Sequence, residues 1–69
     1  MQVIVYTSEI INGRTIELLE SLDGRDIPYE VRQVDTAWVV VNKAKSLPMV
    51  EINGELMTAK KAMKKLKRG

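Results

Sequence analysis

The chain has 69 residues, of which 45% are hydrophobic and 29% charged, with a formal net charge of +2, and this length predicts a single domain with one small core. Cysteine and histidine are both absent, which excludes a thiol redox centre and a thiolate zinc site and removes the most common metal ligand and general base. No apolar run approaches the roughly 20 residues of a membrane span, and the amino terminus lacks the features of a signal peptide, so we expect a cytoplasmic protein without a metal site.

The first half of the chain has the pattern of a strand, a helix and a second strand. Val3–Tyr6 is a short β-branched apolar run, which is typical of a central strand buried on both faces. Residues 7–15 hold turn and capping residues, and an amphipathic helix is expected after them. Its apolar face consists of Ile16, Leu18, Leu19 and Leu22. Residues 23–26 end the helix and residues 29–34 alternate in polarity, so we predict two parallel strands joined by a right-handed crossover.

The middle of the chain has two possible assignments. Residues 37–45 favour a short helix, for which Asp35 or Thr36 is a suitable cap. The run Val39-Val40-Val41 has strand propensity, so a strand-like conformation stays open for this segment.

A hairpin is expected after this segment. Residues 47–52 and 55–58 are strand-like runs separated by Asn53-Gly54. This dipeptide is the one most favoured in type I′ turns, because both of its residues tolerate a positive φ. The pattern therefore predicts an antiparallel hairpin.

A closing amphipathic helix is predicted over residues 59–67. Its apolar face consists of Ala59, Ala62, Met63 and Leu66, at helical spacing. Basic side chains lie between them, namely Lys60, Lys61, Lys64, Lys65, Lys67 and Arg68. The last eleven residues carry these six basic side chains and no acid, a net charge of +6, whereas residues 1–58 carry five basic and nine acidic residues, a net charge of −4. The positive charge is concentrated on this helix.

The order of these elements predicts the fold class. A strand-helix-strand unit followed by helix, hairpin and helix gives an α/β protein with a four-stranded mixed sheet and helices on both faces, which is the thioredoxin-like fold. Four blocks of the sequence also resemble small glutaredoxins, in the same order: residues 2–7, 26–31, 47–50 and 52–54. The resemblance covers nearly the whole chain and implies a single glutaredoxin-like domain over residues 1–69.

The resemblance aligns the family's redox motif with residues that cannot carry out thiol chemistry. In glutaredoxins, a Cys-x-x-Cys motif lies at the amino end of the first helix, where the helix dipole and free amides lower the pKa of a thiol. The matching positions are Asn12, Gly13, Arg14 and Thr15. Neither an amide nor a hydroxyl can form a mixed disulfide. We therefore expect no oxidoreductase activity, no other enzymatic activity and no cofactor.

The resemblance has two further implications. Pro48 matches the family's cis-proline, which leaves the preceding backbone free to bind an extended peptide or glutathione; a trans-proline that starts a strand is the alternative. The family's glycine pair and acidic residue, which hold glutathione, are replaced by Thr58-Ala59-Lys60-Lys61. The charge of this stretch is reversed, which argues against glutathione binding.

Several residues have two or more interpretations. Residues 12–15 form either an anion-binding helix start with Arg14 or only a capped helix start. Trp38 is either a core anchor or an exposed residue that contacts a partner. The basic side chains of residues 60–68 form a solvated face, a contact for an acidic protein surface or a nucleic-acid surface, although no aromatic residue for base stacking lies among them. The methionines expected to fill the core are Met49, Met57 and Met63.

The expected function is binding of another protein by a redox-inactive, glutaredoxin-like monomer. Small glutaredoxin-like proteins are frequent in bacteriophages, so the resemblance extends to a phage factor that binds and modulates a host enzyme. The predicted contact residues are Asn12, Gly13, Arg14, Thr15, Trp38, Leu47, Pro48 and Met49, within the wider segments 8–15, 46–49 and 58–61. One alternative is noncovalent binding of glutathione or another anionic peptide by Arg14 and the backbone before Pro48. The other alternative is nucleic-acid binding through the closing helix.

Overall fold

A computed structural model describes residues 1–66. Seven elements follow one another along these residues: β1 (Val3–Thr7), α1 (Gly13–Gly24), β2 (Glu30–Gln33), α2 (Thr36–Val41), β3 (Met49–Ile52), β4 (Glu55–Thr58) and α3 (Ala59–Leu66). The predicted order of strands and helices is confirmed, and the differences lie at the ends of elements. Lys67 and Arg68, which were assigned to the basic helix, lie outside the described residues.

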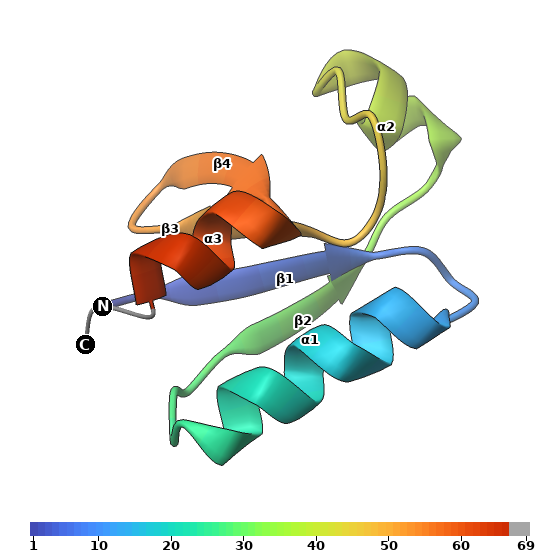
Figure 1. The fold of residues 1–69 in the computed structure, drawn as a ribbon. Helices are drawn as coiled ribbons and strands as arrows, with labels where there is room; N and C mark the ends of the chain where they lie inside the picture. Colours follow the sequence, from blue (N-terminus) through green and yellow to red (C-terminus); the bar gives the residue numbers. More distant parts are fainter. Residues whose placement is uncertain (67–69) are drawn as a thin grey trace.

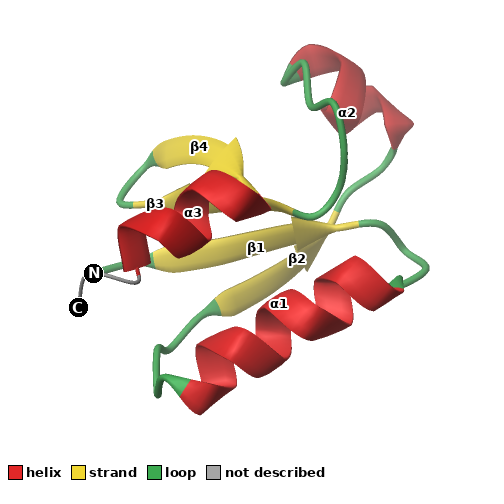
Figure 2. Ribbon diagram, in the orientation of Figure 1, coloured by secondary structure: helices red, strands yellow, loops and turns green. Residues whose placement is uncertain are grey.

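Strand β1 lies inside a four-stranded sheet of order β2-β1-β3-β4. It pairs parallel with β2 and antiparallel with β3, and β3 pairs antiparallel with β4 (Figure 2). Every residue of β1 is buried, which explains its nearly continuous apolar sequence. The central first strand, the parallel pair and the terminal hairpin are all confirmed.

Helices cover both faces of the sheet, as predicted. Helices α1 and α3 lie on the same face (Figure 1), where Leu22 and Leu66 join a core that includes Val5 of β1. On the other face, Trp38 of α2 packs against a smaller cluster that includes Tyr6. Alternate residues of β1 therefore supply the two clusters, because successive side chains of a strand point to opposite faces.

The buried side of α1 differs from the expected one. Its buried residues are Thr15, Leu18 and Leu22, which repeat at i, i+3 and i+7 as one helical stripe. Ile16 was placed on the apolar face, but 48% of its surface is exposed, so this prediction is wrong. The physical reason is a polar contact: the Thr15 hydroxyl lies 3.1 Å from the Thr7 hydroxyl of β1. The buried stripe therefore includes Thr15, and Ile16, which is one residue or about 100° further round the helix, lies outside the interface.

The segment with two possible assignments is helical. Asp35 caps α2, because its carboxylate accepts a hydrogen bond of 2.9 Å from the backbone N–H of Trp38. The helix ends at Val41, and not at Lys45 as predicted. Asn42 follows as the carboxyl-terminal cap, and Lys43 has a φ of 54°, a left-handed conformation that no helix continues.

The hairpin has the predicted turn. Asn53 and Gly54 have φ values of 50° and 89°, and positive values at both central residues define type I′. Strand β3 begins at Met49, two residues later than the predicted start. On α3, Ala62 and Leu66 are buried, which confirms its apolar face. None of the helices within residues 1–66 is long and apolar enough to cross a membrane.

Candidate functional site

A pocket of about 340 Å³ lies between α1, the loop before β3 and the start of α3. Three segments line it, and these are Arg14, Glu17, Leu18 and Ser21 of α1, residues 46–48, and Thr58, Ala59, Lys60 and Met63. Residues 46–48 belong to the predicted contact surface, as do Arg14 and residues 58–60. The fold therefore brings together three segments that are far apart in the sequence.

The start of α1 exposes one of its four predicted site residues to the pocket. Asn12 is the amino-terminal cap, because its side-chain oxygen accepts a hydrogen bond of 3.0 Å from the Thr15 backbone N–H. Thr15 is buried and contacts Thr7. Arg14 lines the pocket, whereas no side chain or backbone of another element within residues 1–66 lies within 4 Å of the position that a Cβ on Gly13 would take. The motif is thus a capped helix start whose cation faces the pocket.

The loop before β3 forms another wall of the pocket. The peptide bond between Leu47 and Pro48 is cis, which is the geometry that the resemblance implied. Pro48 is buried and Leu47 is half-buried. Met49 is also buried, but it belongs to the cluster on the opposite face of the sheet with Tyr6. Of the three predicted residues in this segment, Leu47 and Pro48 line the pocket.

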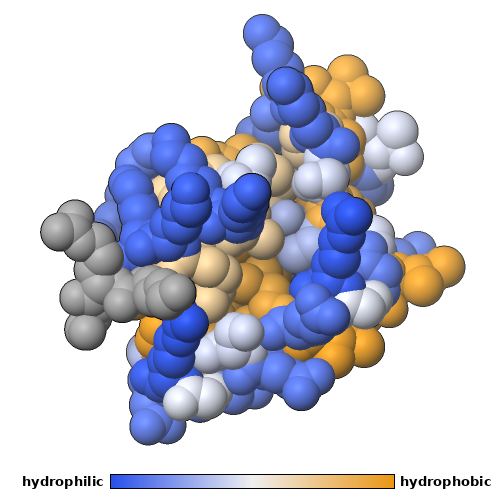
Figure 3. Space-filling model, in the orientation of Figure 1, coloured by the Kyte–Doolittle hydropathy of each residue, from blue (hydrophilic) through white to orange (hydrophobic). Residues whose placement is uncertain are grey.

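The start of α3 adds a second cation to the pocket. Thr58 caps this helix, since its hydroxyl accepts a hydrogen bond of 3.2 Å from the Lys61 backbone N–H. Lys60 lines the pocket together with Arg14 and the carboxylate of Glu17. Two cations and one carboxylate give the lining of the pocket a net positive charge. In Figure 3, hydrophilic side chains (blue) cover α3 and hydrophobic surface (orange) lies beside them.

The remaining lysines of α3 face solvent. Lys61 and Lys64 are exposed. Lys65 donates a hydrogen bond of 3.1 Å to Glu55 of β4, and this bond lowers the pKa of the Glu55 carboxyl. Roughly half of each side chain in this ion pair is exposed, so the pair contributes little to stability.

Trp38 lies on the other face of the sheet and does not line the pocket. Its ring stacks on Tyr6 with a centroid separation of 4.7 Å and an interplanar angle of 27°. The side chain is half-buried, and it also lines a shallow hollow with Glu9, Val34 and Asp35. Trp38 is therefore a core anchor with an accessible edge, and it is separate from the surface around Arg14.

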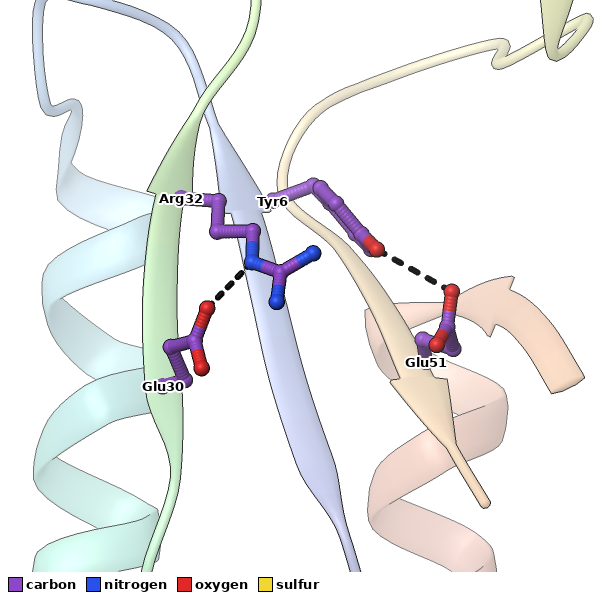
Figure 4. A network of polar contacts seen from close by, with 4 residues as sticks. All are labelled: Tyr6, Glu30, Arg32 and Glu51. Atoms are coloured by element: carbon purple, nitrogen blue, oxygen red, sulfur yellow. Dashed lines mark hydrogen bonds and ion pairs between the residues drawn. The ribbon is translucent and has the colours of Figure 1, made fainter. Parts of the chain in front are cut away.

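A polar network on this second face was missed by the sequence analysis. The Tyr6 hydroxyl donates a hydrogen bond of 3.0 Å to Glu51 of β3, and Arg32 pairs with Glu30 along β2 (Figure 4). Strand pairing places Tyr6 beside Arg32. The alternation of side chains along each strand shows which residues share a face. It does not show which strands are neighbours, and predicting this network needs both.

Titration of Tyr6 is expected to affect stability at alkaline pH. Burial raises the pKa of Tyr6, and the hydrogen bond to Glu51 raises it further. A raised folded-state pKa means that this contribution is complete below the ordinary tyrosine value of about 10 and is lost as the pH rises through the folded-state value. Urea unfolding across this range should show stability falling more steeply for the wild type than for Tyr6→Phe.

Phenolate absorbance provides a direct check of this prediction. In Tyr29→Phe, Tyr6 is the only tyrosine, so the titration reports on a single group. A midpoint at or below about 10 would contradict the prediction.

A further hollow includes part of the predicted contact segments 8–15 and 46–49, but its walls from residues 34–39 were not predicted. It has a volume of about 470 Å³ and is lined by Ser8, Glu9, Ile10, Val34, Asp35, Thr36, Val39 and Leu47. Ile10 is 83% exposed, and Val40 and Val41 of α2 are largely exposed too. Two features of the sequence could have indicated this exposed apolar surface. They are an isoleucine in the loop after β1 and a run of valines on a short helix.

Neither the geometry nor the comparisons with known proteins identify a family. Within residues 1–66, no three acidic side chains are grouped so that they could hold a metal ion. No family model, curated protein or solved structure matches the chain. The sequence resemblance to glutaredoxins therefore stays a prediction.

Proposed function

We propose that this protein is a redox-inactive, glutaredoxin-like binding module with a thioredoxin-like fold. The strand order β2-β1-β3-β4 supports the fold, as do the helices on both faces. The cis bond before Pro48 agrees with the resemblance. The absence of cysteine from the sequence rules out the family's thiol chemistry, so binding is the property that the scaffold retains.

The observation that carries the proposal is the composition of the pocket. Three distant segments converge on a volume of about 340 Å³, which lies at the lower end of the range for small-ligand sites. Such a pocket admits one or two side chains of a partner. Arg14 and Lys60 both line it, and guanidinium and ammonium groups bind carboxylates. We therefore propose that the partner inserts an acidic segment between α1 and α3.

Affinity capture from a bacterial lysate, followed by mass spectrometry, tests this proposal. A bacterial lysate is chosen because the resemblance includes phage proteins that act on host enzymes. The wild type is compared with Arg14→Glu/Lys60→Glu, which reverses both pocket cations. Lys64→Glu is the matched control, because this lysine is exposed on the same helix but lines no part of the pocket.

The expected result is one stoichiometric protein that is retained by Lys64→Glu and lost by the pocket variant. The interaction is then measured with the purified pair, for which loss of both cations should weaken binding at least about tenfold. Equal capture by the wild type and the pocket variant would remove the pocket from the proposal. Trp38→Ala, a change on the opposite face, tests whether the partner also reaches that side.

A second candidate function is noncovalent binding of a small anionic peptide such as glutathione. The two cations beside the backbone of residues 46–48 favour it. Glutathione titrated to about 1 mM should then shift the amide resonances of Arg14, Leu47 and Lys60 in a saturable manner. Unchanged amide resonances at this concentration would eliminate the small ligand and leave the protein partner.

A further inference from the structure

Strand β2 has one free edge. Among residues 1–66 it is an outer strand of the sheet, paired with β1 alone, and all four of its residues are exposed. The backbone N–H of Val34, directly after the strand, donates a hydrogen bond of 2.9 Å to Thr7 of β1. Because backbone groups alternate in direction along a strand, even-numbered residues bond to β1. The N–H and C=O groups of Val31 and Gln33 therefore face the free edge.

The side chains of β2 are self-complementary in charge. Glu30 and Arg32 point to the same face and form an ion pair along the strand (Figure 4). Val31 lies between them and points to the opposite face, where 41% of its surface is exposed. An acid and a base two residues apart come to face one another when two copies of such a strand are aligned antiparallel about the residue between them.

Charge distinguishes among three alignments of two such strands, which are centred on Glu30, Val31 or Arg32. An antiparallel pair centred on Glu30 places two carboxylates opposite each other, and one centred on Arg32 places two guanidinium groups opposite each other. Like charges directly opposite are destabilising. A pair centred on Val31 places Glu30 opposite Arg32 of the second copy, and this contact occurs twice because of the two-fold symmetry.

Hydrogen bonding is compatible with this alignment. The central Val31 residues have their N–H and C=O groups at the free edge, so they exchange two hydrogen bonds. Glu30 and Arg32 of the second copy then form the closely spaced, non-hydrogen-bonded pair, with Cα atoms about 4.5 Å apart. Charged residues on an outer strand normally prevent pairing, but here their order makes one register attractive.

We infer that β2 pairs antiparallel with β2 of a second copy of this chain, centred on Val31, to form one continuous sheet across a dimer. The two Val31 side chains meet on the face that carries α1, and the two ion pairs lie on the face that carries α2. No residue of this strand lines the pocket between α1 and α3, so the pairing uses none of the proposed binding residues. The short strand predicts weak association, with a dissociation constant on the order of 0.1–1 mM, so the protein is monomeric when dilute.

Sedimentation equilibrium over a concentration series that extends to about 1 mM tests the inference. The wild type should dimerise, whereas Glu30→Arg and Arg32→Glu should each raise the dissociation constant about tenfold or more, since both ion pairs become repulsions. The double swap Glu30→Arg/Arg32→Glu should dimerise as the wild type does. Mixing the two single variants should restore association as a heterodimer.

Two further measurements check that the variants fold and that the strands pair in the inferred register. About half of each of these two side chains is exposed in the monomer, so circular dichroism should be unchanged by the substitutions. Slower amide exchange of Val31 at high concentration would support the alignment directly. A wild type that stays monomeric at about 1 mM would overturn the inference, as would single variants that associate as tightly as the wild type.

Discussion

Replacing Leu22 with alanine is expected to lower the free energy of unfolding by about 2–5 kcal/mol. Leu22 is fully buried in the core between α1 and the sheet. The substitution removes its apolar contacts and leaves a cavity that closely packed neighbours fill only in part. A chain of 69 residues has a total stability of roughly 3–10 kcal/mol, so this one change removes a large fraction of it.

Urea unfolding monitored by circular dichroism measures the effect, with Ile16→Ala as the matched control. Ile16 lies on the same helix but is 48% exposed, so its truncation should cost less than about 1 kcal/mol. The pair of variants also tests the orientation of α1. Equal losses from the two substitutions would mean that the helix packs through the face that the sequence pattern suggested.

Replacing Thr15 with valine is expected to cost about 1–3 kcal/mol. The hydroxyls of Thr15 and Thr7 lie 3.1 Å apart and both residues are buried. Valine has nearly the same shape as threonine but cannot form a hydrogen bond, so the variant leaves the hydroxyl of Thr7 without its partner. Removing a buried polar group from water costs free energy, and without a hydrogen-bond partner nothing offsets that cost.

A double-mutant cycle isolates this contact. Thr7→Val/Thr15→Val removes both hydroxyls, and the double variant should be more stable than the sum of the two single losses predicts. Urea unfolding of the four proteins gives the coupling energy. Additive losses would show that each threonine acts independently and that the contact does not orient α1.

The local patterns of the sequence predicted most of the fold. The run Val3–Tyr6 indicated an inner strand, and Asn53-Gly54 indicated a type I′ hairpin. Both are determined by neighbouring residues, because strand burial and turn conformation follow from short stretches of side chains. The spacing of Ala62 and Leu66 likewise predicted the buried face of α3.

The errors occurred where contacts between distant residues decided the outcome. Ile16 was assigned to the buried face of α1 because it is apolar and at helical spacing from Leu19 and Leu22, but the buried stripe includes Thr15, which contacts Thr7 of β1. The sequence favoured a longer helix at residues 37–45, yet the left-handed conformation of Lys43 lies just after its end. Residues 29–34 were correctly predicted as a strand from their alternation, but only the sheet order shows that β2 is an outer strand and exposed throughout.

The candidate site combined both kinds of information. The resemblance to glutaredoxins selected residues 12–15, 46–49 and 58–61, and parts of all three segments line one pocket. The resemblance did not separate the residues that face the pocket from those that support it. Asn12 and Thr15 stabilise the helix start, whereas Arg14 reaches the pocket. Trp38 was grouped with this surface but stacks on Tyr6 on the opposite face.

The sequence by itself determined the kinds and order of the elements, the turn of the hairpin and the absence of thiol chemistry. These depend on residue type and on neighbours within a few positions. Tertiary structure alone decided which face of α1 is buried, which cations share a pocket and which charges lie along a free edge. The physical reason is that these properties arise from pairing between distant strands, and the alternation of side chains in one strand does not specify its neighbour.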